Sequence, residues 1–202
     1  MRCANGDVDG HSVGRANDGS LDDGCELPRS GPGYVSVNAA RFGARRIVGI
    51  VQYATSELAR LHPSAPRVVI GALSREDGGR LKGHKSHQSG RDVDVGYLHE
   101  DGQKAHFVHT TPDSIDVART WTLLGAMLRS GQAQYVFMDY RLQAVLYRHL
   151  ERDGVDESTL GRIFQYPNGR GARRGLIRHA SGHADHFHIR FRCPAEDEDC
   201  ED

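Results

Sequence analysis

The chain has 202 residues, of which 38% are hydrophobic and 26% are charged, and its formal net charge is −1. This length suits one domain with a core of its own. The near-neutral charge excludes a general attraction to nucleic acid or to a membrane surface. No apolar run approaches the ~20 residues that cross a bilayer. Because the first residues lack the apolar stretch of a signal peptide, we expect either a cytosolic protein or one whose leader is not visible.

The N-terminal residues 1–33 are rich in Gly, Asp, Asn and Ser and show almost no apolar periodicity. They predict a loop-rich arm, which is followed by a single domain over residues 34–202. Apolar residues at three- and four-residue steps then predict a helix over 38–62, with Asn38 as its cap. The apolar stripe of this helix would consist of Ile47, Val51, Ala54, Leu58 and Leu61. A β-branched run predicts a buried strand over 67–73.

The rest of the chain alternates strands and helices with long, glycine-rich polar loops, the longest at 74–90 and 167–182. We expect strands over 92–97, 134–138 and 186–192, helices over 117–128 and 141–152, and a short helical turn over 160–164. This order is not a regular alternation of strand and helix along a parallel sheet. It therefore predicts an α+β fold with a small, mainly antiparallel sheet against which the helices pack.

Two histidine-rich stretches, residues 83–95 and 183–188, carry side chains that suit a metal. Their histidines and carboxylates are His84, His87, Asp92 and Asp94 in the first, and His183, Asp185, His186 and His188 in the second. A catalytic zinc takes three protein ligands, commonly His nitrogens and a carboxylate oxygen, and keeps one position open for water. Each stretch runs into a predicted strand, so we expect the two stretches to meet and hold one catalytic zinc.

Strand alternation indicates which side chains share the cleft. Asp94 points away from the apolar residues beside it, and His188 does the same on its own strand. His186 lies two residues before His188 and points to the same face, which suits a group that handles protons beside the metal. Asp92 shares its face with Asp94, and the spacing alone does not choose between the two carboxylates.

The four cysteines do not fit a structural zinc site, because none forms a CxxC pair or lies beside a histidine cluster. Cys193 and Cys200 are close together in the acidic C-terminal segment and favour a short-loop disulfide, which implies an oxidising compartment. Cys3 with Cys25 is the second, weaker pairing.

With these residues in view, the sequence resembles the penicillin-insensitive murein endopeptidases. That family belongs to a wider group of zinc peptidases that includes D-Ala-D-Ala metallopeptidases, lysostaphin and the hedgehog signalling domain. The resemblance rests on an N-terminal segment and on both histidine stretches. Its residues are Ser12-Val13-Gly14, Asn17, Gly19, Leu21, Gly24, Leu27-Pro28, Gly33-Tyr34, Gly78-Gly79, the run Gly83 to Asp94, the run His183 to Pro194, and Cys200-Glu201-Asp202. The middle region, 99–178, matches only loosely.

The resemblance implies a small antiparallel sheet with packed helices and a periplasmic protein. It places the zinc ligands on His87, Asp94 and His188, which favours Asp94 over Asp92. It places catalytic histidines on His186 and His183. His84 would approach the zinc or support its ligands without binding it, and Cys193 with Cys200 would match a family disulfide.

The reaction implied by the resemblance is zinc-dependent hydrolysis of the D-Ala–diaminopimelate crosslink between the peptides of peptidoglycan. Arginine binds carboxylates with a two-pronged geometry, so Arg174 and Arg178, which precede the second stretch together with Arg170 and Arg173, are candidate substrate-binding residues. A flexible, solvated loop is the simpler interpretation of this segment. The alternative functions are a D,D-carboxypeptidase or another stem-peptide hydrolase, a non-catalytic zinc-containing wall-binding module, and, least well supported, a metal-buffering protein.

Overall fold

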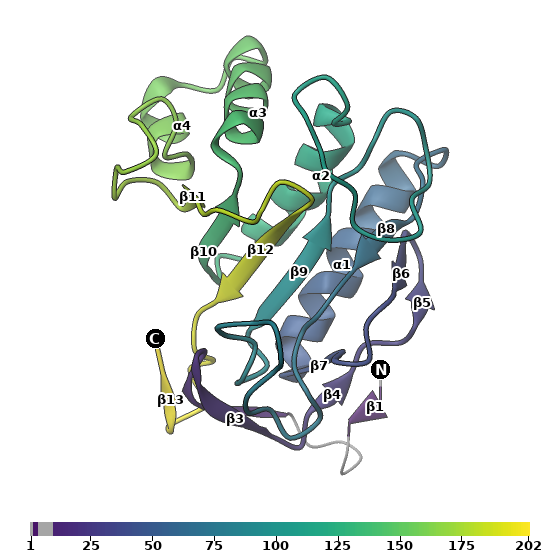
Figure 1. The fold of residues 1–202 in the computed structure, drawn as a ribbon, viewed down its shortest axis with the longest axis vertical. Coiled ribbons are helices and arrows are strands. Elements are labelled where there is room, and N and C mark those ends of the chain that lie inside the picture. Colours follow the sequence, from purple (N-terminus) through teal and green to yellow (C-terminus); the bar gives the residue numbers. More distant parts are fainter. Residues whose placement is uncertain (1, 4–9) are drawn as a thin grey trace.

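The computed structural model describes residues 2–3 and 10–202, which form four helices around a seven-stranded mixed sheet (Figure 1). The helices are α1 (Arg45–Leu61), α2 (Val117–Leu128), α3 (Tyr140–Arg152) and α4 (Glu157–Ile163). In order across the sheet, the strands are β11 (Ile177–His179), β10 (Ala133–Met138), β12 (His186–Phe191), β9 (Asp92–Gly96), β8 (Val68–Ile70), β6 (Tyr34–Ser36) and β5 (Ser30–Gly31).

The predicted α+β class is confirmed, but the sheet is mixed. The pairings β10–β11 and β6–β8 are parallel, and the pairings β10–β12, β12–β9, β9–β8 and β5–β6 are antiparallel. Four of these six pairings are antiparallel, and they include every pairing of β9 and β12, the strands into which the two histidine stretches run. Within the described residues, no helix is long and apolar enough to cross a membrane.

The core lies between the sheet and helices α1 and α2, which run behind the sheet in Figure 1. The alternation of apolar and polar residues along β9 and β12 explains the position of the core. One face of these two strands is apolar and fully buried, and it consists of Val93, Val95, Phe187 and Ile189. Polar residues of the same strands point to the opposite face. That face lies toward the viewer in Figure 1 and carries the loops between β8 and β9 and between β9 and α2.

The first helix begins later than the sequence predicts. Residue 38 is not its cap, because the Asn38 side chain accepts a hydrogen bond from the backbone N–H of Ala40 in a local turn, and α1 begins only at Arg45. The predicted apolar stripe is buried except at Leu61, whose side chain is 49% exposed at the end of the helix. The second helix has the predicted bounds, and the Asp116 carboxylate caps it by accepting from the N–H of Arg119.

The N-terminal segment contains more structure than its composition predicts. It forms the short strands β1 (Arg2–Cys3), β2 (His11–Arg15), β3 (Asp18–Asp22) and β4 (Cys25–Glu26). Two further short strands, β7 (Phe42–Gly43) and β13 (Cys200–Glu201), pair with them in two small sheets. One of these sheets joins β1, β4 and β7, and the other joins β13, β2 and β3. The second sheet therefore brings the C-terminal segment against the N-terminal hairpin. The division into an arm over 1–33 and a domain over 34–202 stays a prediction.

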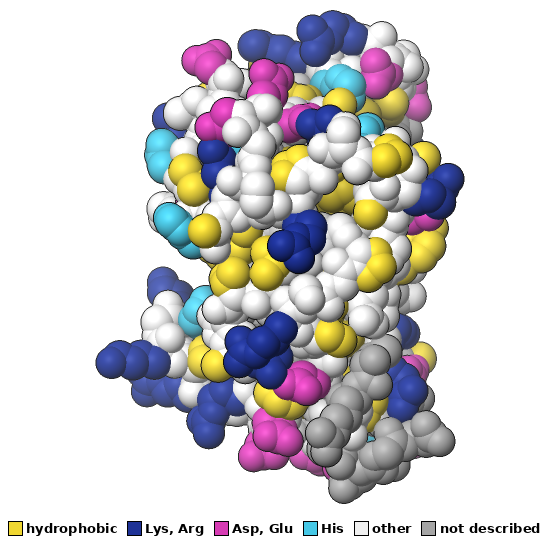
Figure 2. Space-filling view, turned by 90° about the vertical axis from the view of Figure 1, so that its right-hand side faces the viewer, with side chains coloured by type: hydrophobic (Ala, Val, Ile, Leu, Met, Phe, Trp, Pro, Cys, Tyr) yellow, Lys and Arg dark blue, Asp and Glu magenta, His cyan; other side chains and the backbone are white. Residues whose placement is uncertain are grey.

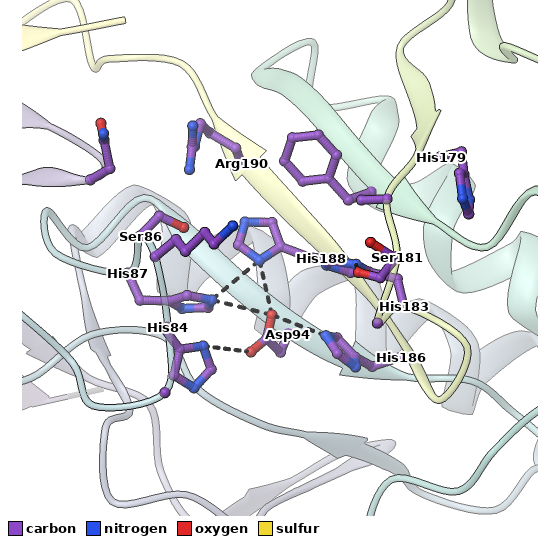
Figure 3. Close-up of a pocket in the computed structure, with 16 residues that line it drawn as sticks. His84, Ser86, His87, Asp94, His179, Ser181, His183, His186, His188 and Arg190 are labelled. Carbon is purple, nitrogen blue, oxygen red and sulfur yellow. Dashed lines mark hydrogen bonds and ion pairs between the residues drawn. The ribbon is translucent and has the colours of Figure 1, made fainter. Parts of the chain in front are cut away.

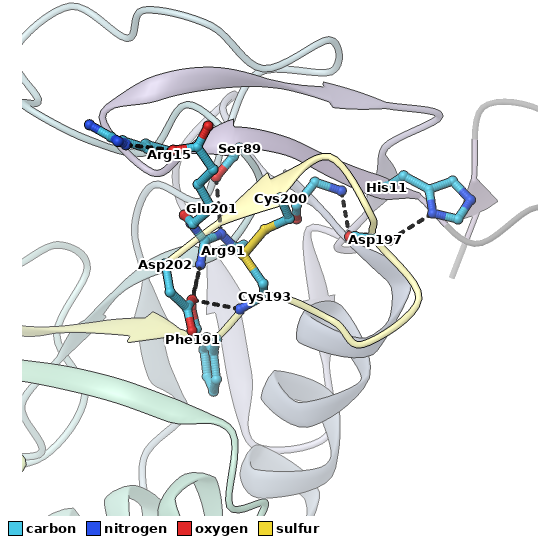
Figure 4. Close-up of a disulfide and its surroundings, with 11 residues drawn as sticks. His11, Arg15, Ser89, Arg91, Phe191, Cys193, Asp197, Cys200, Glu201 and Asp202 are labelled. Atoms are coloured by element: carbon cyan, nitrogen blue, oxygen red, sulfur yellow. Dashed lines mark hydrogen bonds and ion pairs between the residues drawn. A yellow bond between two sulfur atoms is a disulfide. The ribbon is translucent and has the colours of Figure 1, made fainter.

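Both predicted disulfides are present, Cys3–Cys25 and Cys193–Cys200. The second closes a loop whose Asp197 accepts hydrogen bonds from the His11 ring and the Ser12 N–H (Figure 4). Beside it the buried Arg91 donates to the carbonyls of Phe191 and Glu201 and to the Asp202 carboxylate. These contacts hold the C-terminal segment close to the end of β12 at Phe191.

Candidate metal centre

The two histidine stretches meet on the polar face of the sheet, as the sequence predicts. Strand β12 pairs with β9 so that His188 lies directly opposite Asp94, and Arg190 directly opposite Asp92. Facing side chains in an antiparallel pair have their Cβ atoms about 4.5–5.5 Å apart. The register therefore brings an imidazole against a carboxylate at the position where a metal would need both.

Three donor atoms converge at this point (Figure 3). Asp94 Oδ1 lies 3.0 Å from His188 Nδ1 and 3.2 Å from His87 Nε2, and the two histidine nitrogens are 3.2 Å apart. His84 lies at the edge of the cluster, with its Nδ1 3.6 Å from Asp94 Oδ2. His84, His87 and Asp94 also form a group whose ligand atoms lie within 4.8 Å of one another, so this group could bind a metal ion.

His87 reaches the centre from the loop between β8 and β9. Its backbone has a φ of 68°, in the left-handed region that few non-glycine residues adopt. Two contacts hold it there: its N–H donates to Asp92 Oδ2 at 2.8 Å, and its Nδ1 lies 2.6 Å from the Leu73 carbonyl. Because a carbonyl only accepts, Nδ1 carries the hydrogen, and the Nε2 lone pair is left to face Asp94.

Asp92 contacts His188 on the side of the ring away from Asp94. Its buried Oδ1 lies 2.9 Å from His188 Nε2 and accepts from Arg190 Nε at 2.9 Å. A ligating histidine usually donates its second ring N–H to a carboxylate or carbonyl, which fixes the tautomer and the orientation of the ring. Asp92 makes that contact to His188 and leaves its Nδ1 for the centre.

The two carboxylates and His188 shift one another's protonation. Burial opposes charge on Asp92 and Asp94, but their contacts with His188 hold the pKa of both carboxyls well below its usual range. For His188, burial opposes the charged form, but the two carboxylates outweigh it and raise the pKa to about 9. Without a metal, the cluster therefore keeps a proton on His188 at neutral pH.

The remaining histidines line the same cavity. His186 Nε2 points toward the centre and lies 3.7 Å from Asp94 Oδ1, and its Nδ1 lies 2.6 Å from Asp185 Oδ1. The His183 ring lies 4.9 Å from the His186 ring, and burial, followed by the nearby histidines, lowers its pKa. His84 is also more readily deprotonated than usual, because burial and then His87 lower its pKa.

The cavity over the centre has a volume of about 870 Å³. Besides the histidines and Asp94, its lining includes Asn17, Lys85, Phe137 and Arg190. In Figure 2 the surface is hollowed at its left edge, on the side that faces the viewer in Figure 1, and Lys and Arg side chains gather below the hollow. The centre is thus open to a ligand on the face of the sheet that the helices leave free.

Arg174 and Arg178, the predicted substrate-binding residues, lie outside the described lining of this cavity. Arg174 is exposed, and the Arg178 guanidinium lies 4.3 Å from the centre of the Tyr135 ring. The basic side chains of the lining are Lys85 and Arg190, which the sequence reasoning missed. Arg190 could have been predicted from the sequence, because it alternates with His186 and His188 along the same strand.

Comparison with known proteins identifies the family. Residues 12–164 match the family described as penicillin-insensitive murein endopeptidase. The chain belongs to that family. The resemblance drawn from the sequence motifs is therefore confirmed. The matched range contains the first histidine stretch, with His84, His87 and Asp94.

Curated relatives carry the same description. A penicillin-insensitive murein endopeptidase of Haemophilus influenzae is 27% identical over 91% of this chain and 65% of its own length. One of Klebsiella pneumoniae is 27% identical over 95% of this chain and 69% of its own length. The chain thus spans about two thirds of the length of these relatives.

Proposed function

We propose that this member of the penicillin-insensitive murein endopeptidase family is a zinc enzyme that hydrolyses D-Ala–diaminopimelate crosslinks in peptidoglycan. The observation that carries the proposal is the triangle of donor atoms formed by His87 Nε2, His188 Nδ1 and Asp94 Oδ1, with separations of 3.0–3.2 Å. Four ligands at ~2.0–2.1 Å in a tetrahedral arrangement lie roughly 3.3 Å apart. Two imidazoles and one carboxylate, with an open cavity in front, match the donor set of a catalytic zinc.

His188 is the third ligand in this proposal, and His84 supports the site from its edge. The reason is that His188 Nδ1 approaches both other donors, whereas His84 Nδ1 lies 3.6 Å from the second oxygen of Asp94. The His84 side chain is also the more exposed of the two.

The cavity residues have separate roles in the proposed reaction. A bound zinc polarises the scissile carbonyl and lowers the pKa of water, so that no nucleophilic side chain is required. His186 directs Nε2 toward the centre while its Nδ1 is held by Asp185. That nitrogen either donates to the developing oxyanion or carries a proton to the leaving amine. His183 lies behind His186, and Lys85 and Arg190 supply positive charge for the carboxylates of murein peptides.

The two disulfides support a location in an oxidising compartment, since such bonds persist outside the reducing cytosol. We therefore place the protein in the periplasm, in contact with peptidoglycan.

The decisive experiment incubates the purified protein with murein sacculi and follows the muropeptides by chromatography. The expected result is loss of crosslinked dimers and gain of monomers, abolished by a chelator and restored by one equivalent of zinc. Release of free D-Ala with the crosslinks intact would identify a D,D-carboxypeptidase instead. Binding to sacculi without any chelator-sensitive cleavage would identify a wall-binding module.

Two alanine variants test the residue roles. His188→Ala removes a proposed ligand and should abolish stoichiometric zinc binding. His186→Ala should retain one zinc per chain and lose turnover. Full activity in His186→Ala, or full zinc occupancy in His188→Ala, would show that the corresponding role is wrong.

A further inference from the structure

The ring of His186 has contacts on two sides. Asp185 fixes one ring nitrogen, with Oδ1 2.6 Å from Nδ1. A single hydrogen bond leaves the ring free to tilt about that contact, and a tilt would swing Nε2 away from the centre. The second contact is Phe107, whose ring stacks on the imidazole with a centroid separation of 4.9 Å and an interplanar angle of 11°. Asp185 restrains the direction of the ring, and the nearly parallel Phe107 ring restrains its plane. The His183 ring also lies 4.9 Å away but is inclined by 43°, so it does not stack on the imidazole.

Two glycines of neighbouring strand segments leave the space that the Phe107 ring occupies, which is called the glycine seat below. A Cβ atom at Gly71, directly after β8, would lie 2.5 Å from Phe107 Cζ, and one at Gly96, the last residue of β9, would lie 3.2 Å from its Cδ1. Glycine in a strand weakens the strand and often marks a place where another group approaches closely. Here the group that approaches is the ring of Phe107.

The loop that carries Phe107, residues 99–113, is tied to the segment that carries His186. The N–H of Thr110 donates to the carbonyl of Ala184 at 2.7 Å. The Thr110 hydroxyl in turn lies 3.2 Å from Nε2 of the buried His99 at the start of the loop. The loop and the second histidine stretch are therefore held together at a point two residues from His186, and the stacked ring is part of that brace.

Phe107 differs in place from the other aromatic side chains of the site. It is half-buried and is not among the described residues that line the cavity, whereas His186 and Phe137 are. It is also not part of the hydrophobic core behind the sheet. A side chain that neither fills the core nor faces the substrate cavity acts on the site through the residue that it stacks against.

We propose that Phe107 is a positioning residue, which holds the plane of the His186 imidazole so that Nε2 faces the metal centre. This inference rests on the proposed function, in which His186 takes part in catalysis. A reacting group displaced by about 1 Å costs on the order of 100-fold in rate. The loop over 99–113 is thus a brace for a catalytic histidine, and Gly71 and Gly96 are small because the brace needs the room.

The first test is Phe107→Leu, which keeps apolar volume but removes the flat ring. We expect kcat to fall about tenfold or more, with KM within about twofold and one zinc per chain retained. The control is Tyr53→Leu, which removes an exposed aromatic ring on α1 and should leave all three quantities unchanged. Unchanged kcat in Phe107→Leu, or a loss of zinc that accounts for the lower rate, would overturn the inference.

A spectroscopic measurement separates positioning from general support of the fold. A proton of the His186 imidazole that lies over the Phe107 ring should show a ring-current shift in the NMR spectrum of the zinc-loaded protein. The shift should disappear in Phe107→Leu, while the backbone resonances of β9 and β12 stay in place. Loss of the backbone pattern together with the imidazole shift would indicate a structural role and would also refute the proposal.

The glycine seat allows a double-mutant cycle. Gly71→Ala places a methyl group against the Phe107 ring, but also 3.2 Å from Asp94 Cβ. If the methyl acts through the ring, Gly71→Ala lowers kcat in the parent and adds no more than about twofold in the Phe107→Leu background. An equal loss of kcat in both backgrounds would mean that the methyl group acts through Asp94. That result would contradict the proposal that Gly71 is small to make room for the Phe107 ring.

Failure of this inference is distinguishable from failure of the proposed function. A parent protein that shows no chelator-sensitive cleavage of sacculi refutes the function itself. An active, zinc-loaded parent whose kcat does not respond to Phe107→Leu refutes only the role of Phe107.

Discussion

The substitution Asp92→Asn separates the proposed ligands from the residue that supports them. Asp92 is fully buried and receives three donors: the His188 ring and Arg190 on Oδ1, and the His87 N–H on Oδ2. An asparagine has the same shape, but its NH₂ group must face at least one of these donors. The better orientation keeps the carbonyl oxygen toward His188 and Arg190 and loses the bond to His87. The substitution also removes the negative charge beside His188 that would make it a better ligand in its proposed role.

We expect Asp92→Asn to weaken zinc binding about 10–100-fold, as is typical for outer-shell partners of ligating histidines. This range corresponds to ~1.4–2.7 kcal/mol. The free energy of unfolding of the metal-free protein should fall as well, by about 2–4 kcal/mol, because a buried ion pair loses one partner. Competition with a chromophoric chelator measures the first quantity, and urea denaturation of the metal-free protein measures the second.

The matched control is Asp197→Asn in the Cys193–Cys200 loop, away from the proposed zinc ligands. Asp197 is also a buried carboxylate that contacts one histidine ring and accepts from one backbone N–H. Its substitution should lower the stability but leave the zinc affinity within about twofold of the parent value. Equal affinity losses in the two variants would refute the view that Asp92 supports the metal centre directly.

Three further predictions concern protonation, the C-terminal loop and a buried arginine. Because the carboxylates raise the pKa of His188 to about 9, protons compete with zinc below that pH. The zinc affinity should therefore rise by up to about tenfold per pH unit from neutral pH toward about 9. Zinc binding should release one proton, which calorimetry in buffers of different ionisation enthalpy detects. A pH-independent affinity would argue against His188 as a ligand. Replacing Cys193 and Cys200 together by Ser should lower the free energy of unfolding by about 2–3 kcal/mol, and an unchanged denaturation midpoint would contradict this. Arg91→Ala should cost about 2–4 kcal/mol, because it removes a buried guanidinium that donates to the buried Phe191 carbonyl and to the partly buried Glu201 carbonyl. In contrast, Arg15→Ala removes an exposed ion pair to Glu201 and should cost less than about 1 kcal/mol; similar losses in the two denaturation curves would be the contrary result.

The sequence predicted those parts of the fold in which side chains alternate or recur. Strand β9 and strand β12 each have one apolar and one polar face, so the polar face of both was predictable before the strands were known to pair. The bounds of α2 were predictable for the same reason, since its apolar stripe is uninterrupted. The register that sets His188 opposite Asp94 was not predictable, because it depends on contacts between residues far apart in the chain.

The elements that the sequence missed are held by distant partners. Strand β2 has Gly14 and Arg15 paired with Cys200 and Glu201, which follow it by most of the length of the chain. Short strands of this kind contain glycine and polar residues, which favour no element on their own. The stacking of Phe107 on His186 could not be predicted from the sequence for a related reason. A loop has no periodicity from which the position of one ring can be inferred, and the clue lay in two glycines on other segments.

One β-ladder supplies both the metal centre and its support. In the pairing of β9 with β12, Asp94 opposite His188 and Asp92 opposite Arg190 are successive pairs on the same face. A register shift of one residue would set apolar residues of β12 opposite both carboxylates, so the hydrophobic core behind the sheet fixes the donors in front of it. His87 is the exception, since it comes from a loop and adopts a left-handed backbone conformation. Its N–H is bound by Asp92, the same carboxylate that orients His188. Asp92 therefore ties the proposed loop ligand to the proposed strand ligand, and this is why a residue that does not face the cavity should control the affinity of the centre.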